Sequence, residues 1–225
     1  MRLSEVFASI QGEGMLLGVP SLFIRTTGCN LRCVWCDTPY TSWLPEGEEW
    51  SQERILEWVE GFPQVRHVVI TGGEPMLLPA LGALTRAIHA AGRHITIETA
   101  GTVEQAVECD LMSISPKLSN SAPVGTAEFG MHESGRWRPE VLRRLMRGYE
   151  YQLKFVVQEA SDLAEIEGVI RELEAPAERV VLMPEGTRAE VLAERSVWLA
   201  EACKERGYRF SPRLHVLLYG DRRGV

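Results

Sequence analysis

Three cysteines lie close together near the start of the chain: Cys29, Cys33 and Cys36, in a C-x3-C-x2-C pattern. A structural zinc site closes its coordination with four protein ligands, whereas three thiolates leave one position open. A four-iron cluster held by three cysteines exposes one iron in the same way. The spacing therefore predicts a metal centre at which a cofactor or substrate binds directly.

A zinc site is the alternative for this loop, with His67 or His94 as the fourth ligand. Neither histidine has the short spacing from the cysteines that is typical of zinc fingers. Trp35 lies inside the loop, and apolar neighbours of this kind shield an iron-sulfur cluster and tune its potential. We therefore favour a cluster with an open iron. A non-catalytic iron-sulfur or zinc protein is a further alternative.

A second motif, Thr-Gly-Gly-Glu-Pro at residues 71–75, follows a short apolar run. On its own it could be a plain turn, but its glycines allow a ligand to approach the backbone closely. Polar or glycine-rich segments follow four predicted strands, at residues 27–38, 72–75, 99–102 and 116–117. Because the carboxyl ends of parallel strands meet at one edge of a sheet, these segments should converge on one active site.

The elements that position these motifs alternate between short β-branched runs and longer helical patterns, which predicts an α/β fold with a largely parallel sheet. The predicted strands are residues 21–26, 68–71, 95–98, 111–115, 152–157 and 180–183, with 208–211 as a candidate last strand. The predicted helices are residues 51–60, 77–91, 139–147, 162–173 and 188–206.

About six βα units are too few for an eight-fold barrel, so we expect an incomplete, open (β/α) barrel. Residues 119–138 are rich in Gly, Ser and Pro and are predicted to form a long loop that covers a site. No linker interrupts the pattern, which predicts a single domain over residues 1–225.

Composition limits the functional classes. The chain has 225 residues, 45% hydrophobic and 24% charged, as in a globular protein. No apolar run is long enough to cross a bilayer, and the N-terminus lacks the apolar core of a signal peptide. The net charge of −7 argues against a broad nucleic-acid surface. We expect a cytoplasmic protein that acts without a membrane or nucleic acid.

Two charged residues sit at predicted strand ends. Arg25 could clamp a substrate carboxylate with its planar guanidinium, or form a surface ion pair. Glu98 ends an apolar strand, where an unpaired carboxylate would be costly. We expect Glu98 to face the site and to bond substrate or a ribose, and the alternative is a buried partner for Arg93 or Lys117.

The cysteine pattern, with an aromatic residue before its last cysteine, resembles the signature of the radical S-adenosylmethionine superfamily, and residues 71–75 resemble its second motif. Several further segments resemble the 7-carboxy-7-deazaguanine synthase family. They are residues 7–14 (Phe-Ala-Ser-Ile-Gln-Gly-Glu-Gly), 18–20, 23–25, 36–38, 98–102 and 115–117. The combination is specific, because other members of the superfamily share the cysteines without the Gln-Gly-Glu-Gly segment.

The resemblance implies a radical-mediated ring contraction of 6-carboxy-5,6,7,8-tetrahydropterin to 7-carboxy-7-deazaguanine with loss of ammonia, on the route to queuosine and other deazapurines. It implies a 4Fe-4S cluster, S-adenosylmethionine and Mg²⁺ as cofactors. It also implies a homodimer and a low-potential electron donor of the flavodoxin or ferredoxin type. The alternative within the superfamily is an activase that installs a glycyl radical in a partner protein.

The resemblance also implies roles for individual residues. Cys29, Cys33 and Cys36 would hold the cluster and Thr38 the magnesium ion, although a turn hydroxyl is the alternative for Thr38. Glu98 is the candidate catalytic residue. The residues expected to bind substrate are Ile10, Gln11, Gly12, Glu13, Arg25, Thr71 and His215, and those expected to bind the cofactor are Gly73, Glu74, Ser115, Pro116 and Lys117. Met183 stands where the family often has a glutamine, which puts one cofactor contact in question.

Overall fold

The computed structural model describes residues Met1–Val225, and its strands form one sheet in the order β3-β1-β2-β4-β5-β6-β7-β8-β9. The strands are β1 Arg2–Ile10, β2 Pro20–Thr26, β3 Glu48–Glu49, β4 His67–Gly72, β5 His94–Thr99, β6 Leu111–Ile114, β7 Tyr151–Val157, β8 Val180–Pro184 and β9 Arg209–Phe210. All neighbours from β2 to β9 are parallel, whereas β1 and β3 form an antiparallel edge.

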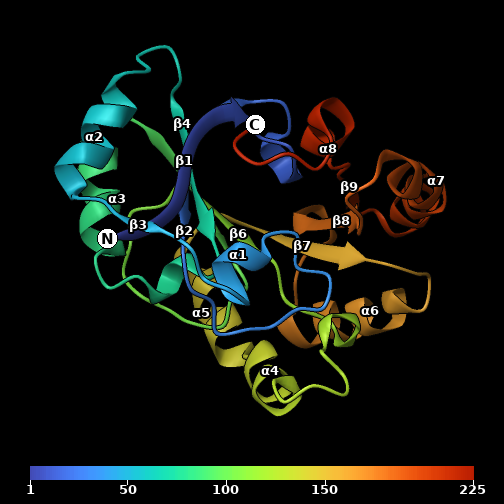
Figure 1. Cartoon of the computed structure of the whole chain (residues 1–225). Coiled ribbons are helices and arrows are strands. Elements are labelled where there is room, and N and C mark those ends of the chain that lie inside the picture. Colours follow the sequence, from blue (N-terminus) through green and yellow to red (C-terminus); the bar gives the residue numbers. More distant parts are fainter.

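Figure 1 shows the sheet as an open arc, with the longer helices on its outer side and α1, α8 and the C-terminus on its inner side. The helices are α1 Pro39–Ser42, α2 Gln52–Glu60, α3 Leu81–Ala90, α4 Phe129–Arg136, α5 Pro139–Gly148, α6 Asp162–Leu173, α7 Ala189–Arg206 and α8 Leu214–Tyr219. Single 3-10 turns form at η1 Gly14–Leu16, η2 Pro75–Leu77, η3 Ser119–Ser121 and η4 Ala177–Arg179.

The two faces of each parallel strand have different neighbours, because successive side chains in a strand point in opposite directions. In β7, Leu153 and Phe155 belong to the main core of 31 buried residues beneath the outer helices. Lys154 and Val156 alternate with them and line a cavity on the inner side. The same alternation in β2, β4, β5 and β6 places a row of polar side chains on the inner face.

Local signals in the sequence account for several helix ends. Ser51 caps α2 by accepting a hydrogen bond from the backbone N–H of Arg54 at 3.1 Å. Gly207 ends α7 with a left-handed φ of 70°, a conformation that glycine adopts without a steric penalty. Pro139 occupies the first turn of α5, where its missing N–H costs nothing.

The predicted incomplete barrel is confirmed, since β3 and β9 remain at opposite edges and the sheet does not close. Six parallel strands are of ordinary length, and the candidate last strand forms as the two-residue β9. The helix predicted for residues 77–91 begins only at Leu81, because Pro75–Leu77 forms a separate 3-10 turn.

Three segments differ from the sequence prediction. The predicted long loop at 119–138 contains η3 and α4, and α4 was missed because it buries only one residue, His132. The N-terminal residues form β1, and the tail folds into α8. No helix of the chain combines the length and apolar character that crossing a membrane requires.

Candidate active site

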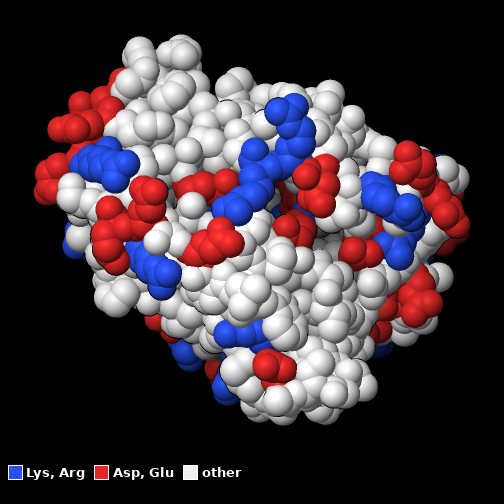
Figure 2. All heavy atoms as spheres, viewed as in Figure 1, with Lys and Arg blue, Asp and Glu red and all other residues white.

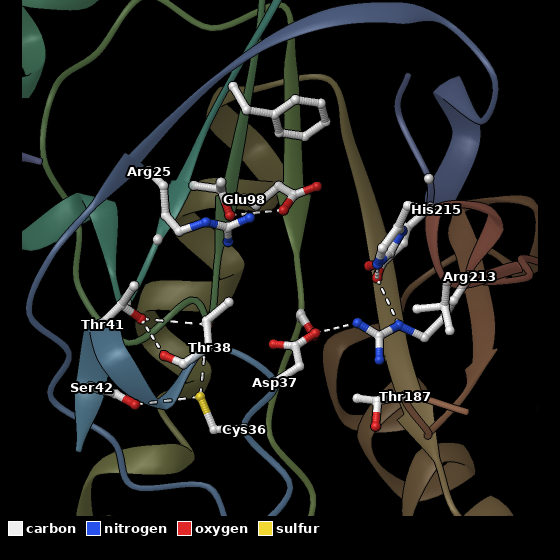
Figure 3. Close-up of a pocket in the computed structure, with 18 of the residues that line it drawn as sticks. Arg25, Cys36, Asp37, Thr38, Thr41, Ser42, Glu98, Thr187, Arg213 and His215 are labelled. Atoms are coloured by element: carbon white, nitrogen blue, oxygen red, sulfur yellow. Dashed lines mark hydrogen bonds and ion pairs between the residues drawn. The ribbon is translucent and has the colours of Figure 1, made fainter. Parts of the chain in front are cut away.

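A cavity of about 510 Å³ opens on the inner side of the arc, at the carboxyl ends of the parallel strands. This volume is in the range of small-molecule sites. Residues from the cysteine loop, from the inner faces of β2 to β8 and from the C-terminal tail line it (Figure 3). The motifs at the strand ends therefore converge on one cavity, as expected from the sequence.

Cys29, Cys33 and Cys36 all line this cavity as free thiols. Burial raises the pKa of Cys29 to about 12 and that of Cys33 to about 11. These two thiols are therefore protonated near neutral pH, and a metal that binds them would have to displace their protons. Leu31 and Ala100 pack against Cys33 and form a small apolar cluster under the loop. The three thiols thus face the cavity above a small apolar cluster.

The donor geometry fits a multi-iron cluster better than zinc. No three His, Cys, Asp or Glu side chains converge on a single-ion position. A four-iron cluster has no such requirement, because each cysteine binds a different iron. His67 and His94 begin β4 and β5, so they lie at the opposite end of those strands from the cavity and cannot complete a zinc site.

The segment at 119–138 is connected to the cysteine loop by several hydrogen bonds. The backbone N–H of Val34 donates to the Ser121 carbonyl at 3.0 Å. The N–H of Arg32 donates to His132 Nδ1 at 3.1 Å, and His132 Nε2 lies 2.9 Å from Ser121 Oγ. Trp35 Nε1 donates to the Asn120 carbonyl at 3.1 Å. The segment therefore supports the loop rather than covering the cavity.

The Gly-Gly-Glu-Pro turn packs directly on the cysteine loop. A Cβ atom at Gly73 would collide with the carbonyl oxygen of Gly28, the residue before Cys29. The N–H of Glu74 donates to that same carbonyl at 2.9 Å. The Glu74 carboxylate points away from the cavity and accepts from Thr99 Oγ1 at 2.7 Å and from the Ala100 N–H at 2.8 Å.

Two of the expected cofactor residues lie outside the cavity lining. Glu74 does not line the cavity, because the residue is only 1% exposed and its carboxylate bonds the turn after β5. Pro116 is also buried outside the lining. Gly73, Ser115 and Lys117 do line it. Lys117 Nζ donates to Ser115 Oγ at 2.9 Å and lies 5.7 Å from the centre of the Trp35 ring.

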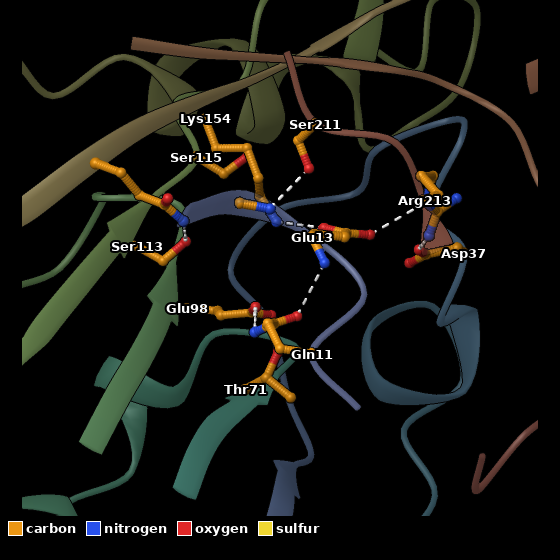
Figure 4. Close-up of polar contacts among 12 residues, drawn as sticks. Gln11, Glu13, Asp37, Thr71, Glu98, Ser113, Ser115, Lys154, Ser211 and Arg213 are labelled. Carbon is orange, nitrogen blue, oxygen red and sulfur yellow. Dashed lines mark hydrogen bonds and ion pairs between the residues drawn. The ribbon is translucent and has the colours of Figure 1, made fainter. Parts of the chain in front are cut away.

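Glu98 faces the cavity and bonds neither of the partners considered as alternatives. It accepts hydrogen bonds from Gln11 Nε2 at 3.2 Å and from Thr71 Oγ1 at 2.9 Å (Figure 4). Arg93 instead donates to backbone carbonyls, and Lys117 bonds Ser115. Two of the expected substrate residues are therefore organised by the candidate catalytic carboxylate.

The loop at residues 10–14 forms one wall of the cavity, with Ile10, Gln11, Gly12 and Glu13 all in the lining. Burial opposes ionisation of Glu13, but Lys154 and Arg213 outweigh it and hold the pKa of the carboxyl far below its usual range. Arg213 Nε lies 3.1 Å from Glu13 Oε1, and Lys154 Nζ contacts Oε2. Glu13 is therefore a buried, ionised acceptor.

His215 lies against this wall from the tail. A Cβ atom at Gly12 would collide with the His215 ring, which explains the glycine at that position. Burial lowers the pKa of His215, with partial compensation from Glu13 at 4.0 Å. His215 is therefore neutral near pH 7.

Arg25 forms a largely buried ion pair rather than the surface pair considered from the sequence, since only 18% of its side chain and 15% of that of Glu5 are exposed. Its Nε donates to Glu5 Oε1 at 2.7 Å, and Tyr40 donates to the same oxygen at 2.8 Å. Its terminal nitrogens make no hydrogen bond to protein and face the cavity (Figure 3). The parallel rings of Phe7 and Phe23, 4.9 Å apart, form the neighbouring apolar surface.

Thr38 lies at the start of α1 on the cavity side. Its hydroxyl makes no capping bond to the backbone, in contrast to the turn alternative. Thr38 Oγ1 lies 3.8 Å from Cys36 Sγ and accepts from Thr41 Oγ1 at 3.4 Å. A free oxygen donor is therefore available beside the last cysteine of the loop.

Several lining residues were not predicted from the sequence: Asp37, Lys154, Arg213 and the tail from Gly220 to Val225. Lys154 had a usable signal, because a charge inside a buried strand needs a partner. Asp37 lies in the family-like segment at 36–38, but neither it nor Arg213 gave a signal of their pairing, which depends on the folded tail.

Comparisons with known proteins agree with this geometry. The sequence model of the Radical SAM superfamily matches residues 23–121. The 7-carboxy-7-deazaguanine synthase of Rhodopirellula baltica is 45% identical over 99% of this chain and 88% of its own length. The enzyme of that name from Halobacterium salinarum is 42% identical over 97% of this chain and 90% of its own length.

A solved structure has the same fold. The crystal structure of QueE from Escherichia coli superposes with a TM-score of 0.72 and 27% sequence identity, and the match covers 95% of this chain and 94% of that one. The sequence relatives, the superfamily match and the shared fold together show that this chain belongs to the 7-carboxy-7-deazaguanine synthase family of radical S-adenosylmethionine enzymes.

Proposed function

We propose that this cavity converts 6-carboxy-5,6,7,8-tetrahydropterin to 7-carboxy-7-deazaguanine with loss of ammonia. The observation that carries the proposal is the meeting of two different walls in one cavity. One wall is the thiol pocket of Cys29, Cys33 and Cys36, and the other is the polar set of Gln11, Glu13, Arg25 and Glu98.

The thiol pocket and its neighbours would hold the cofactors. Cys29, Cys33 and Cys36 would ligate a 4Fe-4S cluster, and Gly73, Ser115 and Lys117 would bind S-adenosylmethionine beside it. When bound, this pair supplies a one-electron cleavage that starts hydrogen abstraction from the substrate. Gly73 has no side chain to block the backbone, and Leu31 and Ala100 provide apolar packing beneath the loop.

The polar wall suits a pterin, which presents hydrogen-bond donors and acceptors along one edge. Glu13 and Glu98 accept hydrogen bonds, while the amide of Gln11 both donates to Glu98 and accepts from the Glu13 N–H at 3.1 Å. The free end of Arg25 would bind the substrate carboxylate through its planar fork. Thr71 fixes Glu98 through its hydroxyl.

Three features of the proposal go beyond the family assignment. Thr38 would bind Mg²⁺ through its hydroxyl, because this hard cation prefers oxygen ligands and readily shares them with a carboxylate. A low-potential donor of the flavodoxin or ferredoxin type would reduce the cluster. The enzyme would act as a homodimer.

Anaerobic reconstitution with iron and sulfide tests the function. We expect a brown protein that forms 7-carboxy-7-deazaguanine from 6-carboxytetrahydropterin when S-adenosylmethionine, a low-potential reductant and magnesium are present. Cys33→Ala should lose both the brown colour and the product. The proposal fails if the loaded wild-type protein cleaves S-adenosylmethionine but gives no deazapurine from the pterin.

A further inference from the structure

Arg213 joins parts of the cavity wall that are far apart in the sequence. It precedes α8, and only 6% of its surface is exposed. Burying a guanidinium costs free energy unless hydrogen bonds and opposite charges compensate for the lost hydration. In Figure 4 its side chain lies between Glu13 and Asp37.

The three contacts of this guanidinium reach three different segments. Nε donates to Glu13 Oε1 at 3.1 Å, in the loop that forms the polar wall. Nη1 donates to the Gly186 carbonyl at 2.7 Å, in the connection after β8. Nη2 donates to Asp37 Oδ2, in the cysteine loop. Because the guanidinium is planar and rigid, these contacts fix the three segments relative to one another.

The two carboxylates differ in how much they depend on Arg213. Glu13 is also held by Lys154, and its loop is tied to the tail by the N–H of Leu214, which donates to the Gly12 carbonyl at 2.9 Å. Asp37 makes no other hydrogen bond or ion pair, and 42% of its side chain is exposed. Arg213 is therefore the one hydrogen-bond and ion-pair partner of the Asp37 side chain.

The position of Asp37 in the chain gives this contact a functional meaning. Asp37 stands between Cys36, which would hold the cluster, and Thr38, which would hold magnesium. On the other side, Glu13 belongs to the wall proposed to bind the pterin. A single side chain thus connects the substrate wall to the residues that hold the metals.

We propose that Arg213 is a positioning residue that couples the substrate-binding loop at 11–14 to the cysteine loop at 29–38. This inference rests on the proposed function. A substrate that binds Glu13 restrains the position of Arg213. Because Arg213 also bonds Asp37, the substrate thereby restrains the positions of Cys36 and Thr38. Without Arg213, cofactor cleavage proceeds without productive delivery to the pterin.

The test compares Arg213→Met, Arg213→Lys and Asp37→Asn with the wild-type enzyme. Lysine keeps the charge but cannot reach three separate acceptors. Arg206→Met is the matched control, because Arg206 pairs with Glu167 at 2.8 Å between α7 and α6, away from the cavity. Two quantities are measured. The first is amide hydrogen exchange of residues 11–14 and 29–38 in the protein without cluster. The second is the 5′-deoxyadenosine released per 7-carboxy-7-deazaguanine formed by the loaded enzyme.

We expect Arg213→Met to speed exchange in both segments, while Arg206→Met changes neither. Released 5′-deoxyadenosine per product should rise about tenfold, equivalent to about 1.4 kcal/mol. Arg213→Lys should lie in between. Asp37→Asn should raise the same ratio, and combining it with Arg213→Met should add little, as expected for one shared interaction.

The inference is wrong if exchange at 29–38 stays at the wild-type rate, or if the variants lose turnover with no change in the ratio. If Arg213→Met does not fold, the same two measurements on Arg213→Lys and Asp37→Asn test the inference. A wild-type enzyme that makes no deazaguanine would instead refute the proposed function, while the exchange result would still report on the link between the loops.

Discussion

At the scale of single residues, Glu98 is held by two donors, Gln11 Nε2 and Thr71 Oγ1, one at each carboxylate oxygen. Glu98→Gln replaces one acceptor by a donor that must face another donor. Because a lost bond to a charged group costs about 1.5–3 kcal/mol, we expect kcat/KM for the pterin to fall roughly 10- to 100-fold. Anaerobic steady-state kinetics measures this.

The control for Glu98 is Glu57→Gln, a carboxylate exposed on α2 that should leave kcat/KM unchanged. Circular dichroism should show that both variants are folded at the temperature of the assay. Equal kinetics for wild type and Glu98→Gln would remove Glu98 from the site.

The Thr38 hydroxyl, 3.8 Å from Cys36 Sγ, is the oxygen ligand proposed for magnesium. After magnesium is removed with a chelator, turnover should fall and recover on addition of Mg²⁺. Thr38→Ala should need roughly tenfold more Mg²⁺ for half-maximal recovery, because one oxygen ligand is lost. Thr38→Ser, which keeps the hydroxyl, should titrate like the wild type. Identical titrations for all three proteins would exclude Thr38 as a ligand.

Sequence patterns identify residues at this scale only when the pattern is local. The cysteine spacing and the Gly-Gly-Glu-Pro turn are local, and the structure brings both to one cavity. Glu74 shows the limit, because a motif does not reveal whether its carboxylate points to the ligand or, as here, to Thr99 and Ala100. The ion pair of Asp37 and Arg213 left no pattern, since its members are 176 residues apart.

At the scale of elements, the turn after β4 and the cysteine loop are packed backbone to backbone. Gly73→Ala would press a methyl group on the Gly28 carbonyl, and backbone cannot move aside as a flexible side chain does. Overpacking of this kind costs about 1–3 kcal/mol in the free energy of unfolding. Displacing Gly28 also displaces Cys29, so we expect reduced iron content after reconstitution.

Urea unfolding and iron analysis of Gly73→Ala measure these two effects. Gly148→Ala is the control, because a Cβ atom there would meet no neighbouring atom. Wild-type iron content in Gly73→Ala would show that the two loops move independently.

His67 links three neighbouring strands at their buried ends. Its Nδ1 lies 2.7 Å from Ser21 Oγ in β2, and its Nε2 lies 2.7 Å from Thr96 Oγ1 in β5. Burial, with a smaller contribution from His94, lowers the pKa of His67 from 6.5 to about 4. The unfolded chain therefore binds a proton below pH 6.5, while the folded protein does so only near pH 4.

The stability that depends on neutral His67 is thus present above pH 6.5 and is lost as the pH falls toward 4. Between pH 7 and pH 5 the loss should be about 2 kcal/mol, measured by urea unfolding. In His67→Gln this part of the pH dependence should vanish, whereas His89→Gln, at a half-exposed position on α3, should keep it. The same slope in all three proteins would contradict the assignment.

The elements with strong periodicity were predictable, and those with weak periodicity were not. The helix at 162–173 was predicted with the bounds of α6, because its apolar spacing and following turn are clear. For α4, a single buried histidine gives too little apolar pattern to identify a helix. β1 was missed because it pairs antiparallel with β2 and β3, outside the run of βα units, and its residues are mostly half-exposed.

At the scale of the whole molecule, the two ends of the chain build the same cavity. The loop after β1 supplies Glu13, and Arg213 reaches it from a position 200 residues further along. An open barrel needs such a contribution, because the outer strands do not meet and the gap between them must be filled. The alternation of strands and helices predicted the open barrel. The contribution of the tail to the cavity can be seen only in the folded structure.

The last residues cover the mouth of the cavity. Gly220–Val225 all line it. The Arg223 guanidinium lies 3.6 Å from the centre of the Tyr40 ring and 3.2 Å from Glu46 Oε2. Figure 2 shows basic and acidic side chains next to one another in the middle of this face, near the C-terminus marked in Figure 1. The tail is therefore a strap held by exposed contacts rather than by core packing.

Removing residues 221–225 should open the cavity to water without unfolding the protein. We expect KM for the pterin to rise roughly tenfold, because the substrate loses one wall and the site admits solvent. The melting temperature should change little, since these residues are exposed or half-buried and none belongs to the core. Arg223→Ala should give part of the effect, because it removes the stacking on Tyr40 and the ion pairs with Glu46 and Glu5 but leaves the rest of the tail in place. Arg147→Ala, an exposed arginine on α5, serves as the control. A truncated enzyme with the wild-type KM would show that the strap has no part in substrate binding, and a large fall in melting temperature would show that it belongs to the folded core.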